Sequence, residues 1–173
     1  IENALSILTI MRPIHHTFAP LADAAYCRKT FGLLCQPWKW KRGTETELFR
    51  HELTGAFGCD TFFFATGREA LLALLRALKL TPGEEVIVQG YTCVVVPNAI
   101  QAAGMVPIYC DIEKATLNLD FDALEKAVTP RTRVVICQHT FGIPADTERL
   151  RAFCDERSLI LIEDCAHVLP DHT

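Results

Sequence analysis

The stretch EVIVQGYTCVVVPNAIQAAGMVPIYC, residues 85–110, decides the fold class. It contains two apolar runs of strand length, 85–89 and 106–110, and between them a helical segment that Pro97 opens and Gly104 closes. Strands that read as continuous Val and Ile runs, separated by a helix, are typical of parallel sheets with both faces buried. The stretch therefore predicts an α/β fold.

The same alternation continues on both sides of this stretch. Further strands are expected at 60–66 (DTFFFAT), 132–138 (TRVVICQ) and 159–163 (LILIE), and further helices at 68–80, 121–128 and 145–158. The helix at 121–128 can be capped by Asp120 or Asp122. Five strands would thus alternate with four helices, which predicts three layers around a mainly parallel sheet.

Residues 1–59 lack this alternation, and we interpret them as an N-terminal extension packed on a domain formed by residues 60–173. They include an amphipathic helical segment at 44–57. The aromatic and basic cluster at 38–42, WKWKR, suits packing against the sheet domain or a partner subunit, and it also suits an interfacial patch on a membrane. We favour packing and expect no membrane contact.

Composition excludes several classes of protein. Among the 173 residues, acidic side chains exceed basic ones by 21 to 17, and no Lys/Arg-rich block is present, so we expect no nucleic-acid partner. The eight cysteines contain no CxxC pair, which argues against a zinc or thioredoxin site and favours free thiols in a reducing cytoplasm. No apolar stretch is long enough to span a bilayer. The chain starts at Ile1 and stops at Thr173 with no terminating signal, so both ends look cut.

Polar residues follow the predicted strands, and parallel strands would bring them to one edge of the sheet, where α/β folds bind ligands. These groups are Thr66-Gly67-Arg68-Glu69, Tyr91-Thr92-Cys93, His139-Thr140 and Glu163-Asp164-Cys165-Ala166-His167. Gly67 before a helix allows an anion such as phosphate to approach, although the junction could be only a tight turn. Asp164 follows an apolar strand and needs a cationic or donor partner, unless it is a helix cap. His139 and His167 could face a ligand or be satisfied polar contacts.

These segments, in this order, resemble the DegT/DnrJ/StrS family of sugar aminotransferases, which depend on pyridoxal phosphate (PLP). The similar stretches are TGREAL (66–71), PGEEVIVQGYTC (82–93), GMVPIYCDIEKATLNLD (104–120), CQHTFGIPAD (137–146) and LILIEDCAHVLP (159–170). The resemblance runs from about residue 45 to residue 170. It implies the large domain of the type I PLP-dependent transferase fold, present here incompletely.

The resemblance also implies roles for individual residues. Gly67 and Arg68 would hold the PLP phosphate, Asp164 would pair with the protonated pyridine nitrogen, and His167 would lie near the phenolic oxygen. Cys93 stands where the family often places an aromatic that stacks on the ring, and whether Tyr91 replaces it is open. The family's Schiff-base lysine belongs to a later segment that this chain does not reach. We therefore expect no catalytic residue and no metal ligand within the chain.

The resemblance further implies an aminotransferase that acts on a nucleotide-linked keto sugar, with an amino acid as donor, in a cytoplasmic homodimer. Two alternatives stay open, namely a PLP-dependent sugar dehydratase of the same family and a truncated, non-catalytic remnant. The strand order of the type I fold, 3-2-4-5-6-7-1, would leave the strand at 60–66 without a neighbour.

Overall fold

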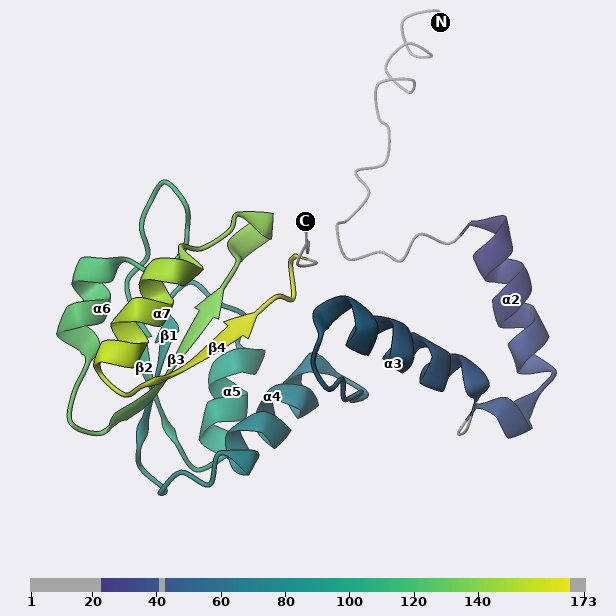
Figure 1. The fold of residues 1–173 in the computed structure, drawn as a ribbon, viewed down its shortest axis with the longest axis horizontal. Helices are drawn as coiled ribbons and strands as arrows, with labels where there is room; N and C mark the ends of the chain where they lie inside the picture. The colour runs from purple at the N-terminus through teal and green to yellow at the C-terminus, as the bar shows by residue number, and fades with distance from the viewer. Residues whose placement is uncertain (1–22, 41–42, 169–173) are drawn as a thin grey trace, which may run out of the picture. The chain divides into compact units, whose positions relative to one another are not determined.

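The computed structural model describes residues 23–40 and 43–168, which fall into two compact units that divide between residues 51 and 52. The sheet lies in the second unit (Figure 1). Within the described ranges, no helix is long and apolar enough to cross a membrane.

The first unit contains a helix that the sequence analysis did not anticipate. Helix α2, Ala24–Leu34, begins where the Asp23 carboxylate accepts a hydrogen bond from the N–H of Tyr26 at 2.7 Å. A short 3-10 turn, η1 (Pro37–Lys39), follows, and the Trp40 indole donates to the Leu33 carbonyl at 2.7 Å. Helix α3, Thr44–Phe57, has the predicted bounds and crosses the division between the two units. Neither α2 nor α3 has a buried residue, and both carry large apolar side chains that are exposed.

The second unit is built on a four-stranded, all-parallel sheet in the order β2-β1-β3-β4. The strands are β1 (Glu85–Gln89), β2 (Val106–Cys110), β3 (Thr132–Gln138) and β4 (Ile160–Asp164). Three of them have the predicted bounds, and β4 is shifted by one residue. The order equals the 3-2-4-5 block of the expected type I sheet, which confirms the predicted fold class.

Helices cover both faces of the sheet (Figure 1). Helices α4 (Gly67–Ala77) and α5 (Val95–Ala102) pack on Val86, Val88, Val134 and Ile136. Helices α6 (Phe121–Ala127) and α7 (Thr147–Glu156) cover the opposite face. Because β1 is fully buried along all five residues, its continuous apolar run is explained by this double cover.

The strand predicted at 60–66 is not formed. The segment has no regular secondary structure, and Phe62, Phe63 and Phe64 are 76%, 41% and 48% exposed. A strand requires a neighbouring strand, and none of the described strands pairs with residues 60–66. The assignment of this segment as a strand is therefore wrong for this structure.

Candidate active site

A cavity of about 870 Å³ lies between the beginning of α4, the beginning of α5 and the end of β4. It brings together residues that are far apart in the chain, namely 66–71 and 74 from α4 with its cap, 95–96 from α5 and 162–166 from β4 and the turn after it. Of the predicted site residues, Gly67, Arg68 and Asp164 line this cavity. No lysine of the described segments lines it.

The first turn of α4 presents backbone donors to this cavity. Thr66 is the N-cap, and its hydroxyl accepts a hydrogen bond from the N–H of Glu69 at 3.2 Å. The N–H groups of Gly67 and Arg68 belong to the first helical turn, where no carbonyl within the helix can accept them. A methyl group built on Gly67 would meet nothing within 4 Å, so there is room for an anion against the backbone.

Asp164 ends β4 and is held by two neutral donors. Its Oδ2 accepts a hydrogen bond from Gln138 Nε2 at 2.9 Å, and its Oδ1 accepts one from the N–H of Ala166 at 3.1 Å. In the described part of the chain, no cationic side chain forms an ion pair with this half-buried carboxylate. The carboxylate is therefore oriented by two donors, and within the described residues its charge has no cationic partner.

Gln138 was not singled out from the sequence, although the sheet register explains its contact. Gln138 and Asp164 are partners across the β3–β4 ladder, so their side chains leave the same face. The Gln138 Oε1 atom is buried and has no hydrogen-bond partner among the described atoms. This side chain is thus bound through its amide nitrogen alone.

His167 lies on the turn after β4 and contacts the loop that follows β3. Its Nδ1 accepts a hydrogen bond from the N–H of Phe141 at 3.1 Å, and its ring stacks on the Phe141 ring with centroids 5.6 Å apart and an interplanar angle of 3°. The Tyr91 ring packs edge-on against the Phe141 ring, with the two centroids 6.1 Å apart. Phe141 was not singled out from the sequence either.

The remaining predicted residues lie apart from the cavity lining. His139 is buried, and its Nδ1 accepts a hydrogen bond from the N–H of Ala145 at 3.1 Å. Its Nε2 lies 3.6 Å from a Glu163 oxygen. These contacts support the interpretation of His139 as a satisfied polar contact. Cys93 is exposed and does not line the cavity, while its carbonyl accepts the N–H of Val96. Thr92 carries a buried hydroxyl without a partner among the described atoms.

The eight cysteines are free thiols. Burial raises the pKa of Cys110 to about 11 and the pKa of Cys137 to about 12, and nearby carboxylates act in the same direction. These two thiols therefore stay protonated at neutral pH and behave as small apolar side chains.

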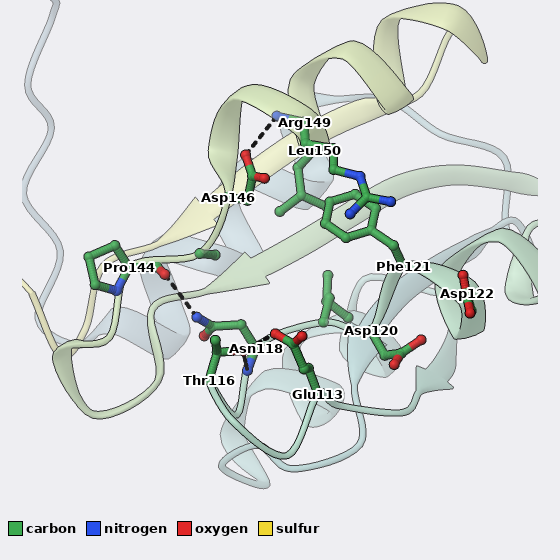
Figure 2. Close-up of a pocket in the computed structure, with 12 residues that line it drawn as sticks. Glu113, Thr116, Asn118, Asp120, Phe121, Asp122, Pro144, Asp146, Arg149 and Leu150 are labelled. Atoms are coloured by element: carbon green, nitrogen blue, oxygen red, sulfur yellow. Dashed lines mark hydrogen bonds between the residues drawn. The ribbon is translucent and has the colours of Figure 1, made fainter.

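A second cavity, of about 430 Å³, lies where α6 and α7 begin (Figure 2). Its polar groups already serve the fold: Asp120 and Asp146 cap the two helices, and Asn118 donates to the carbonyls of Ile143 and Pro144 at 3.1 Å each. Arg149 lies over the Phe121 ring at 3.8 Å. Over the described segments, no group of three or more His, Cys, Asp or Glu side chains could hold a metal ion. The larger cavity is the better candidate.

The fold and the larger cavity define a class. A parallel sheet in this order, with helices on both faces and the start of α4 facing the end of β4, is part of the large domain of PLP-dependent aminotransferases. The chain belongs to the DegT/DnrJ/EryC1/StrS aminotransferase family, whose family model matches residues 30–172. The resemblance inferred from the sequence motifs is confirmed.

Two curated relatives are aminotransferases. One, the dTDP-4-dehydro-2,3,6-trideoxy-D-glucose 4-aminotransferase of Saccharopolyspora spinosa, is 35% identical over 127 residues, which are 72% of this chain and 33% of the relative. The other, the UDP-N-acetyl-3-dehydro-alpha-D-glucosamine 3-aminotransferase of Acidithiobacillus ferrooxidans, is 31% identical over 153 residues, covering 88% and 41%. The chain thus spans between 33% and 41% of the length of these two relatives.

A solved structure supports the same assignment. The NtdA protein of Bacillus subtilis, crystallised with bound cofactor PMP, matches with a TM-score of 0.74 and 30% identity, over 82% of this chain and 33% of that one.

Proposed function

We propose that the protein binds PLP in the larger cavity and transfers an amino group from an amino acid to a nucleotide-linked keto sugar. The observation that carries the proposal is the placement of Asp164, with its charge unpaired in the described structure, in one cavity with the open first turn of α4. The two curated relatives act on nucleotide-linked keto sugars by name, and the NtdA structure holds PMP.

The residues present fit the parts of PLP. The N–H groups of Gly67 and Arg68 suit its phosphate, because the start of a helix favours an anion and Gly67 leaves room for one. Asp164 suits the pyridine nitrogen, since a carboxylate about 4 Å from a cation at a dielectric constant of about 20 stabilises the pair by about 4 kcal/mol. When bound, PLP supplies a ring that accepts the electron pair released as a substrate carbon loses its proton.

The chain's own side chains contribute orientation and charge. Gln138 and the N–H of Ala166 direct the two Asp164 oxygens, so the carboxylate does not rotate away from the ring nitrogen that it would keep protonated. His167 is proposed to contact the phenolic oxygen, and Cys93 to lie near the ring in place of the usual aromatic; both residues stand outside the set that lines the cavity. Residues 60–173 would be the first part of the large domain, in a homodimeric cytoplasmic enzyme.

An Asp164→Asn variant of the full protein tests the proposal, with Asp122→Asn as the matched control. Asp122 is an exposed carboxylate in the first turn of α6, outside the larger cavity. Asp164→Asn should lower the rate of amino transfer from the donor to PLP by at least about 100-fold, because about 4 kcal/mol of charge stabilisation exceeds two tenfold steps of 1.4 kcal/mol. The control should stay within about twofold.

Single-turnover absorbance measurements with an amino acid donor give these rates. A near-normal rate in Asp164→Asn would remove this residue from the proposed role. Release of water from the keto sugar, without amino transfer, would assign the protein to the dehydratase alternative.

A further inference from the structure

The loop after β3 adopts an unusual backbone conformation. Phe141 has φ 52° and ψ 25°, and Gly142 has φ 86°. The left-handed region is uncommon for a bulky side chain, and such residues persist where surrounding contacts hold them. A methyl group on Gly142 would come within 3.6 Å of the His167 carbonyl, so the loop lies directly against the turn after β4.

Two contacts join this loop to His167. The N–H of Phe141 donates to His167 Nδ1 at 3.1 Å, and the two rings stack almost parallel. In this left-handed turn, the N–H and the ring of Phe141 both meet the same imidazole. Hydrogen bonds from the N–H of His139 to the Asp164 carbonyl (3.4 Å) and from the N–H of Thr140 to Asn118 Oδ1 (3.2 Å) tie down the preceding residues.

We propose that Phe141 is a positioning residue that selects one tautomer of the neutral His167 ring, with the proton on Nε2. An imidazole nitrogen that accepts a hydrogen bond carries no proton, so a neutral ring must carry it on the other nitrogen. The stacked Phe141 ring restricts rotation of the imidazole, which keeps Nδ1 on the backbone donor. Tyr91, edge-on to Phe141, supports that ring from the side.

This role matters for chemistry only if the proposed function holds. A His167 held in this way offers an N–H donor at Nε2, which suits an oxygen acceptor such as the phenolic oxygen of PLP. The assignment of the proton itself does not depend on PLP, so it can be measured separately.

The test uses the full protein labelled with ¹⁵N-histidine, at about pH 8, where imidazole is neutral. Two-bond proton–nitrogen spectra identify which ring nitrogen carries the proton, and a His167→Gln variant assigns the signals. Phe141→Gly removes the ring while glycine still tolerates the left-handed backbone, and Phe141→Tyr keeps the ring. Tyr109→Ala, which removes an exposed aromatic from the edge strand β2, is the control.

The wild type, Phe141→Tyr and Tyr109→Ala should all show His167 with the proton on Nε2. Phe141→Gly should show a mixture of both tautomers and at least about tenfold faster hydrogen exchange at the residue 141 amide, because the hydrogen bond opens more often. A wild-type proton on Nδ1, or an unchanged tautomer in Phe141→Gly, would overturn the proposal. If the tautomers behave as expected while PLP does not bind, the positioning role stands and the proposed function fails.

Discussion

Replacing Glu85 by glutamine should destabilise the sheet unit without touching the candidate site. Glu85 begins β1, at the end of the strand opposite the larger cavity, and is only 1% exposed. Its Oε1 accepts two hydrogen bonds from Arg131, at 2.9 and 2.6 Å, and its Oε2 accepts from the Thr129 and Thr132 hydroxyls. The side chain therefore ties the turn before β3 to the central strand.

The expected loss is about 2 kcal/mol of unfolding free energy. Hydrogen bonds to a charged group contribute about 1.5–3 kcal/mol, but the Arg131 side chain is 73% exposed, so its share is reduced by water. Glutamine still accepts from the threonine hydroxyls, which keeps the loss near the lower part of that range. Against a domain stability of about 5–15 kcal/mol, this is a large change.

The loss should depend on pH. The hydrogen bond from Thr129 is the main cause that holds the pKa of Glu85 below its ordinary value of 4.5, Arg131 acts in the same direction, and burial opposes them. A carboxyl with a lowered folded-state pKa contributes its stability above the unfolded-state pKa and loses it as the pH falls through the folded-state pKa. Wild type and Glu85→Gln should therefore converge in acid.

Urea unfolding at pH values from about 7 down to about 3 measures both effects. The control is Glu113→Gln, an exposed carboxylate that accepts a hydrogen bond from Thr116 at 2.9 Å and should change stability by less than about 0.5 kcal/mol. Equal stability of wild type and Glu85→Gln at pH 7, or a gap that stays constant into acid, would refute the reasoning.

Two further predictions concern the cavity and the surface. Gln138→Val should weaken PLP binding about tenfold in equilibrium dialysis, because Asp164 loses its side-chain donor, and an unaltered PLP affinity would contradict this role of Gln138. The free energy of unfolding should change by less than about 1 kcal/mol, because the substitution also removes a buried oxygen that has no described partner. Residues 1–173 expressed alone should self-associate, because Phe62, Phe31 and Trp38 are 76%, 71% and 70% exposed. Light scattering measures the association, and a monodisperse monomer at micromolar concentration would contradict this prediction.

The sequence predicted the sheet well because each of its strands has a short apolar centre and lies between clear helix signals. The segment 60–66 has the same composition, yet strand formation depends on a neighbour that local composition does not report. Helix α2 was missed because its apolar residues are interrupted by Gly32 and two basic residues, although Asp23 gives a cap signal that could have indicated it.

The site residues at the ends of helices and strands could be predicted from the sequence, whereas the contacts between distant elements could not. Gly67 and Arg68 could be predicted as site residues because they begin a helix after a turn, and Asp164 because it follows an apolar strand. The Gln138 contact requires the β3–β4 register, and the hydrogen bond of the Phe141 N–H requires His167, which lies 26 residues further along the chain. Such contacts belong to the tertiary structure.

The strand order also bears on how the chain folds as it leaves the ribosome. Strands β1 and β2 are joined through α5, so this pair can form from a continuous local segment. The next strand to be synthesised, β3, does not extend the sheet beside β2 but returns to the open side of β1. Until residue 138 has emerged, one side of β1, the strand that is buried along its whole length in the folded protein, stays unpaired. An unpaired strand edge favours aggregation, so the nascent chain is vulnerable during this interval.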